Sequence, residues 1–112
     1  MRSQNTALES ATAEILEALA HPLRIRILKG LLERRYCQCE LALKFEAHPV
    51  DISRHLAVLK RAGLVLITKQ GNKTFPELLC PEIGEILKTA ESIVHRTASQ
   101  RVKEARSLKA SL

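Results

Sequence analysis

Three cysteines carry the most distinctive chemistry of this chain. Cys37 and Cys39 are separated by a single glutamine, and Cys80 follows much later. The polar stretch over residues 1–6 lacks the apolar core of a signal peptide, so we expect a cytoplasmic protein whose cysteines are thiols. An odd number of thiols in that compartment indicates metal or redox chemistry rather than a disulfide framework.

Helix geometry limits how Cys37 and Cys39 could share one ion. Residues two apart on a regular helix point about 200° away from each other. The pair can therefore bind an ion only if Cys37 lies at or before a helix start, or if the helix end distorts. Free N–H groups there would also lower the thiol pKa. For Cys80, two interpretations stay open: a third ligand, or a small buried apolar residue before Pro81.

No pattern in the chain indicates an enzyme. It has no glycine-rich phosphate loop, no nucleophile elbow and no recognisable pair of catalytic carboxylates. A thiol hydrolase built from Cys37 and a histidine would lack a fold large enough to form a cleft. His21 and His48 have no ligand partner at metal spacing, so we interpret them as a cap or turn residue and a loop residue.

Composition favours one small helical domain with a basic surface. The 112 residues fit a single domain over 1–112. Hydrophobic residues make up 46% and aromatic residues 3%, which favours helices packed through Leu, Ile, Val and Ala. The net charge of +6 favours nucleic acid as the partner, although solubility or anionic lipid would also explain it. No apolar stretch reaches the ~20 residues of a membrane span, so we expect no membrane partner.

Periodicity and stop signals divide the chain into elements. Apolar spacing predicts helices over residues 8–20, 22–32, 37–45 and 50–62, with a turn at 46–49. Gly63 is placed to end the fourth helix. An apolar run at 64–67, a polar loop at 69–73 and a return at 74–79 predict a hairpin, in which Pro76 must lie on an edge or at a bulge. A long helix begins at Ile83, and residues 1–7 and 100–112 are expected to be flexible tails.

The two terminal helices carry apolar residues that predict a homodimer. Those of the last helix recur at near-heptad spacing, which suits packing against a second copy, and the first helix would contribute to the same interface. Packing within one subunit is the alternative. The predicted interface residues are Leu8, Ile15, Ile86, Leu87, Ala90, Ile93 and Val94.

The helix over residues 50–62 has one apolar face and one basic face. Turning about 100° per residue from Ile52 places Leu56 and Leu59 on the core side. The opposite face and its flank are basic with small residues between, and hold Val50, Ser53, Arg54, Ala57, Lys60 and Arg61. Such a surface suits the DNA major groove, where Arg can pair with guanine and Ala can meet a thymine methyl. An ordinary solvated face is the alternative.

The order of short helix, turn, basic helix and hairpin is that of a winged helix-turn-helix. We therefore predict a mainly α fold with a β-hairpin wing whose tip meets the DNA backbone. The predicted partner is double-stranded DNA, and no cofactor is expected to be required for binding it.

Three blocks in this order resemble the ArsR/SmtB family of metalloregulatory repressors. They are Leu19–Leu28, Ile52–Leu59 and Ala62–Val65. The resemblance implies a dimer that blocks operator DNA and releases it when a toxic ion binds. It also implies DNA contacts from Ser53, Arg54 and His55, and from the wing residues Lys69, Gln70, Asn72 and Lys73. The chain departs from the family pattern after the wing turn, where it has Thr74-Phe75-Pro76.

The segment Tyr36–Leu41 resembles the family's Cys-x-Cys-[Asp/Glu]-Leu box for soft metals and arsenite. The resemblance implies that Cys37 and Cys39 bind a thiophilic ion such as arsenite, Cd(II) or Pb(II). Ala42 stands where some members have a third cysteine. Of the family's second sensing site only Glu91 and His95 are present, so we interpret these as a solvated pair. A redox-sensitive thiol pair and a pair without a role are the alternatives.

Overall fold

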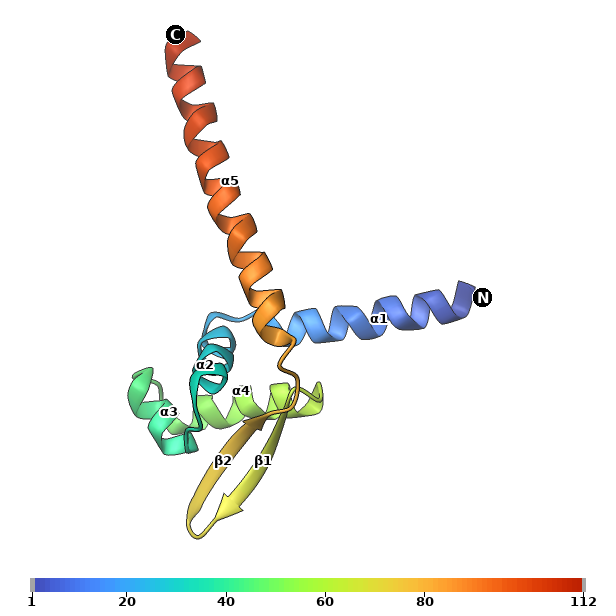
Figure 1. Cartoon of the computed structure of the whole chain (residues 1–112), viewed down its shortest axis with the longest axis vertical. Coiled ribbons are helices and arrows are strands. Elements are labelled where there is room, and N and C mark those ends of the chain that lie inside the picture. Colours follow the sequence, from blue (N-terminus) through green and yellow to red (C-terminus); the bar gives the residue numbers. More distant parts are fainter. Residues whose placement is uncertain (1, 112) are drawn as a thin grey trace. The chain divides into compact units, whose positions relative to one another are not determined.

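Five helices and two strands form the part of the chain described by the computed structural model, residues 2–111 with side chains from Thr6 to Lys109 (Figure 1). The chain divides into two compact units, one ending at Pro81 and one beginning at Glu82. The first unit contains α1 (Arg2–Leu19), α2 (Pro22–Glu33), α3 (Gln38–Lys44), α4 (Pro49–Arg61), β1 (Val65–Gln70) and β2 (Lys73–Leu78). The second contains α5 (Ile83–Ser111). None of the helices in the described range is long and apolar enough to cross a membrane.

Local signals explain where α2 and α4 begin and end. His21 and His48 are their N-caps, and each Nδ1 accepts the N–H two residues on, at 3.1 Å. A proline occupies the first turn of both helices, where its missing N–H costs nothing. Gly63 follows α4 with φ of +80°, the left-handed conformation that glycine adopts without strain. The predicted stop at Gly63 is confirmed, as is a capping role for His21.

The core of the first unit is aliphatic. Ile27, Leu28, Leu41, Ile52 and Leu59 are fully buried, and among the described residues no polar or charged residue is buried. Ile52, Leu56 and Leu59 all lie inside, as the helical periodicity of α4 predicts. The opposite face of α4 is thereby turned to solvent.

The hairpin is longer, and its turn shorter, than the sequence predicts. β1 and β2 pair antiparallel from Val65↔Leu78 to Gln70↔Lys73, and project as a ribbon (Figure 1). The turn is only Gly71-Asn72, with Gly71 at φ of +62°. Polar residues were expected to end the strands, but backbone pairing does not need apolar side chains. Pro76 lies opposite Ile67 in a two-stranded sheet, so the predicted edge position is confirmed.

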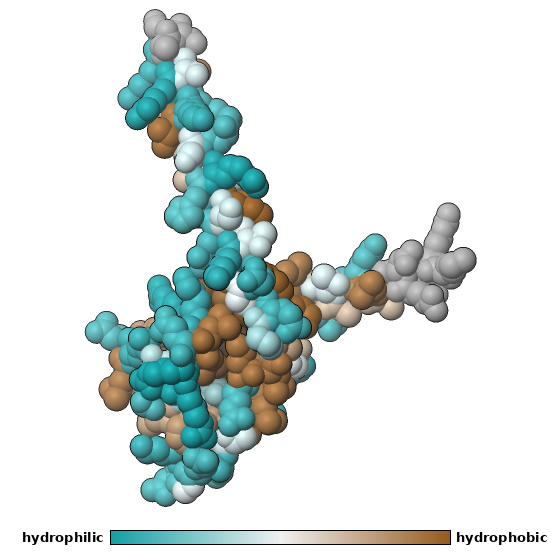
Figure 2. All heavy atoms as spheres, viewed as in Figure 1, coloured by the Kyte–Doolittle hydropathy of each residue, from teal (hydrophilic) through white to brown (hydrophobic). Residues whose placement is uncertain are grey.

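Apolar side chains stay exposed along α1 and along α5 (Figure 2). Leu8 is 69% exposed, and Ile93 and Val94 are 46% and 62% exposed. Of the tails predicted over 1–7 and 100–112, residues 2–7 and 100–111 are helical, and residues 1 and 112 lie outside the described residues. The charged segment after Ser99 is rich in Arg, Lys, Glu, Ala and Leu, which are strong helix formers even without an apolar stripe.

Candidate nucleic-acid interface and cysteine site

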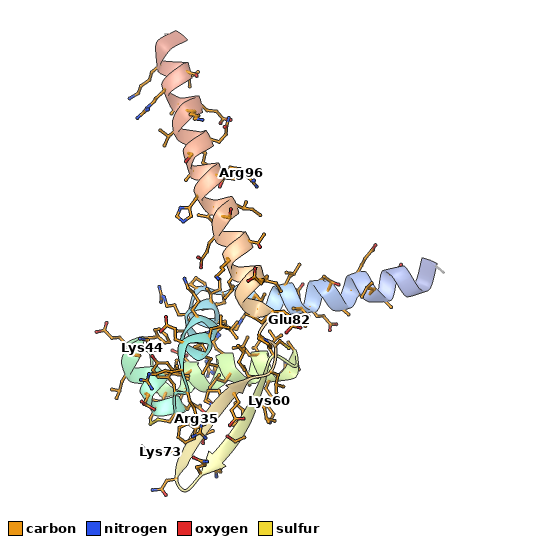
Figure 3. All side chains as sticks on the ribbon, in the orientation of Figure 1. Arg35, Lys44, Lys60, Lys73, Glu82 and Arg96 are labelled. Carbon is orange, nitrogen blue, oxygen red and sulfur yellow. A yellow bond between two sulfur atoms is a disulfide. The ribbon has the colours of Figure 1, made fainter. Side chains whose placement is uncertain are left out.

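The basic residues of α4 lie on its exposed face, where their side chains are accessible to solvent. Ser53, Arg54, Ala57, Lys60 and Arg61 are all exposed. Within residues 6–109, the polar side chains of this face make no hydrogen bond or ion pair. Figure 3 labels Lys60 on this helix. We call this surface the α4 face.

His55 does not belong to the α4 face. Its side chain is partly buried, its Nδ1 lies 3.2 Å from Nη1 of Arg24, and its ring centroid is 4.2 Å from that of His21. Burial lowers the pKa of His55, and the nearby His21 and Arg24 lower it further. His55 was placed among the DNA contacts by resemblance alone. Its position about 60° from Ile52 on the helix turns it toward α2 instead.

The wing tip exposes four predicted DNA-contact residues: Lys69, Gln70, Asn72 and Lys73. Gln70 is also tied down, because its Oε1 accepts a hydrogen bond from Nη1 of Arg35 at 3.2 Å. Sequence reasoning missed Arg35 altogether. Its guanidinium lies 3.8 Å from the ring centroid of Phe75, and Nη2 is 3.9 Å from Oε1 of Glu77 (Figure 3). Arg35 thus attaches the chain before α3 to both wing strands.

Cys37 lies outside α3, as an ion site shared with Cys39 requires. It is the N-cap residue, with an extended backbone at φ −76° and ψ 160°. Its Cα is 5.4 Å from that of Cys39, and the two sulfur atoms are joined in a disulfide instead of being the two thiols expected. Cys37 is buried at 1% exposure, whereas Cys39 is exposed.

A capping box fixes the start of α3. The N–H of Glu40 donates to Sγ of Cys37 at 3.3 Å, and the Glu40 carboxylate accepts the N–H of Cys37 at 2.9 Å. That second hydrogen bond is the main cause of the lowered pKa of Glu40, and Arg34, 3.6 Å away, adds to it. Arg34 also stacks over Tyr36 at 3.6 Å.

A pocket of about 600 Å³ opens beside Cys39. Its walls come from α3, the α3–α4 turn and the wing tip. Ala42, Leu43 and Pro49 give it an apolar side, and Lys73 gives it a cationic edge. The exposed sulfur of the pair therefore faces a space between the helix-turn-helix and the wing.

Cys80 is not brought to the cysteine pair. Its Sγ lies 3.7 Å from the carbonyl oxygen of Gly63, at the base of the hairpin, whereas the pocket beside Cys39 is lined by the hairpin tip. Six strand residues separate base from tip, roughly 20 Å of extended chain. No group of three His, Cys, Asp or Glu side chains able to hold a metal ion occurs among the described residues. The structure thus argues against Cys80 as a third ligand.

The fold is that of winged helix-turn-helix transcriptional regulators, a class of DNA-binding proteins and not of enzymes. Residues 21–66 match the model of the bacterial regulatory protein arsR family. The HTH-type transcriptional regulator Rv0081 of Mycobacterium tuberculosis is 35% identical over 108 residues, which cover 96% of this chain and 95% of that protein. The chain belongs to the ArsR family of transcriptional regulators.

Solved structures agree with this fold. The crystal structure of Rv0081 has a TM-score of 0.74 and 38% identity, and covers 85% of this chain and 96% of its own. The homodimeric winged helix-turn-helix domain of Mb0332 from Mycobacterium bovis has a TM-score of 0.71 at 21% identity, covering 80% of this chain and 83% of its own. The transcriptional repressor SmtB of M. tuberculosis is 34% identical over 80 residues, 71% of this chain and 59% of that protein.

Proposed function

We propose that this protein is a dimeric repressor that binds operator DNA and releases it when a thiophilic ion binds Cys37 and Cys39. The observation that carries the proposal is the position of Cys37 before the first turn of α3, which turns its sulfur toward that of Cys39. The name of the SmtB relative, a transcriptional repressor, supports the direction of regulation. We expect the protein to act in the cytoplasm.

DNA binding is proposed for the α4 face and the wing tip together. Ser53, Arg54, Ala57, Lys60 and Arg61 would enter the major groove, and the wing residues Lys69, Gln70, Asn72 and Lys73 would meet the backbone. The unpartnered state of the α4 face supports this assignment, since Arg and Lys side chains are free to pair with base edges and phosphates.

Dimerisation is proposed for α1 and α5. Both helices expose apolar side chains that a second copy would cover, and the Mb0332 domain with the same fold is homodimeric. The interface would use Leu8, Ile15, Ile86, Ala90, Ile93 and Val94. Leu87, predicted with them, is only 6% exposed and is already covered within the chain, so it is left out of the proposed interface. Sedimentation equilibrium at micromolar concentration should give about 25 kDa, twice the 12.5 kDa of the chain. A species of 12.5 kDa would rule the dimer out.

The chain's own contacts suggest how an ion at the cysteines would reach the DNA surface. Cys37 caps α3, α3 packs against α4 and contains the buried Leu41, and Arg35, two residues before Cys37, contacts the wing. Soft ions prefer thiolate ligands, and Cys37 and Cys39 would provide two of them. Any further ligand would be a group other than these two cysteines. A displacement of the segment from Arg35 to Cys39 would therefore disturb α4 and the wing at once.

The test is a titration of the operator complex of the reduced protein with arsenite, Cd(II), Pb(II) and Zn(II). DNA release is expected for wild type and for Cys80→Ser, the matched control at a cysteine away from the pair. Cys37→Ser and Cys39→Ser should lose the response. Coupling is reciprocal, so DNA should weaken ion binding by the same factor, typically about 5- to 150-fold. Full ion sensitivity in Cys37→Ser would show that the pair is not the site.

A thiol redox switch is the second candidate, because Cys37 and Cys39 are joined in the structure. In this form, oxidation to the disulfide and not an ion would change DNA affinity. The comparison is between the operator affinity of the reduced protein and that of the diamide-oxidised protein, both in the presence of chelator. A change on oxidation with no response to any ion would favour this candidate over the first.

A further inference from the structure

The two sulfurs of the Cys37–Cys39 disulfide have opposite surroundings. Sγ of Cys37 is buried and accepts a hydrogen bond from the N–H of Glu40. Cys39 is exposed and lines the pocket between α3 and the wing tip. A thiolate that attacks this disulfide can therefore reach only one of the two sulfurs in the folded protein.

We infer that Cys39 is a site of mixed-disulfide formation with an anionic low-molecular-weight thiol, held in the pocket beside Lys73. The inference deepens the redox form of the proposed function and rests on it. It adds which sulfur reacts, with which class of compound and where the adduct lies.

The exchange balances without any further oxidant. The incoming thiolate forms a bond to Sγ of Cys39, the bond between Cys37 and Cys39 breaks, and its electron pair leaves on Sγ of Cys37. The released Cys37 thiolate then takes a proton from solvent. The N–H of Glu40 already donates to this sulfur and would stabilise negative charge on it, so Cys37 is the better leaving group.

The pocket also selects the thiol. Its volume of about 600 Å³ is large enough for a small peptide-like thiol, and Ala42, Leu43 and Pro49 provide contact for the carbon skeleton. Lys73 is the charged residue of the lining, so a carboxylate on the incoming thiol would be favoured over an ammonium group. An adduct there would occupy the space between the helix-turn-helix and the wing.

Peptide mapping of the full-length oxidised protein tests the position of attack. The protein is reacted with 3-mercaptopropionate and quenched in acid, and tandem mass spectrometry then locates the adduct. Cys39 should carry it in excess over Cys37 by about tenfold or more, because attack depends on access. The same reaction in 6 M guanidinium is the control, and there the preference should disappear. An adduct shared equally in the folded protein, or found on Cys37, would overturn the inference.

The role of charge is tested with a cationic thiol and a variant. Rates for 3-mercaptopropionate and cysteamine are compared at equal thiolate concentration. Lys73→Gln should lower the ratio of anionic to cationic rates by about two- to fivefold, the size of an exposed charge pair. An unchanged ratio would contradict the pocket's preference for an anionic thiol. Peptide mapping measures the position of the adduct, whereas the diamide comparison measures operator affinity without small thiols. A failure of the redox form of the proposed function is therefore distinguishable from a failure of this inference.

Discussion

The segment from Arg34 to Glu40 and the α4 face differ in how their polar groups are satisfied. In the segment, Arg34 and Arg35 both stack on aromatic rings, and Cys37 and Glu40 cap each other. On the α4 face, Arg54 and its polar neighbours make no hydrogen bond or ion pair with the described side chains. Two adjacent parts of one helix-turn-helix thus differ: the polar groups of the segment interact with one another, whereas those of the α4 face do not.

The difference indicates two roles. The segment from Arg34 to Glu40 keeps one arrangement of its side chains, whereas the α4 face is available to bind a partner. A network whose members satisfy one another has one preferred arrangement, so a change at Cys37 must be passed on to its neighbours. A face of unpartnered Arg and Lys gains its interactions only from outside, and a polyanion provides them. The comparison predicts that substitutions in the segment change stability, whereas substitutions on the α4 face change DNA affinity.

The largest expected effect is on the stability of α3. Leu41 is fully buried, so Leu41→Ala should lower the free energy of unfolding by about 2–5 kcal/mol, from lost burial and the cavity left behind. Leu43, two residues on and 81% exposed, is the matched control, and Leu43→Ala should change stability by less than about 0.5 kcal/mol. Urea denaturation measures both. Equal effects would mean that α3 does not pack on the core through Leu41.

The second effect belongs to the α4 face. Arg54→Ala should weaken operator binding by about 1–3 kcal/mol if Arg54 makes a bidentate base contact, and should leave the urea midpoint unchanged. Lys73→Ala should weaken all DNA sequences alike and reduce the salt dependence, as expected for a phosphate contact. Fluorescence anisotropy with operator and scrambled DNA separates the two. Unchanged operator affinity in Arg54→Ala would show that the wrong face was chosen.

The helices, the strands and the α4 face can be predicted from local sequence. The contacts that could not be predicted join residues far apart in the chain. Pro22, Pro49 and Gly63 mark helix ends within a residue or two, and the period of Ile52, Leu56 and Leu59 identifies the buried side of α4. Helix geometry also predicted that Cys37 meets Cys39 only at or before a helix start, or with a distorted helix end, and Cys37 is the N-cap residue.

Arg35 and His55 show why the rest could not be predicted. Arg35 donates a hydrogen bond to Gln70 at the end of β1 and stacks on Phe75 of β2. No spacing pattern connects residues so far apart in the sequence. His55 was assigned from resemblance, although its helical angle from Ile52 already disagreed with the exposed face. Its partner Arg24 comes from α2, which only the folded chain brings near.

The third effect tests the cap at Cys37 apart from its sulfur chemistry. In the reduced protein, Cys37→Ser keeps an acceptor for the N–H of Glu40, whereas Cys37→Ala removes it. The Ala variant should therefore be less stable than the Ser variant by about 0.5–2 kcal/mol, the usual effect of a lost N-cap. Thermal unfolding with reductant present gives the comparison. Equal stability of the two variants would mean that the capping box does not hold α3.

The smallest effect concerns His55, which lies on α4 yet has internal partners like those of the segment. Its pKa is lowered below 6.5, first by burial and then by His21 and Arg24, so the unfolded chain binds this proton more readily than the folded one. Stability is then fully present above pH 6.5 and is lost as the pH falls through the folded pKa. His55→Asn keeps an acceptor for Arg24 but cannot take up the proton, so it should lose less stability than wild type between pH 7.5 and pH 5.5. Urea midpoints of both proteins at these two pH values measure the difference. Equal losses of stability in wild type and His55→Asn would mean that the internal contacts of His55 do not matter, and that His55 belongs with the exposed residues of the α4 face.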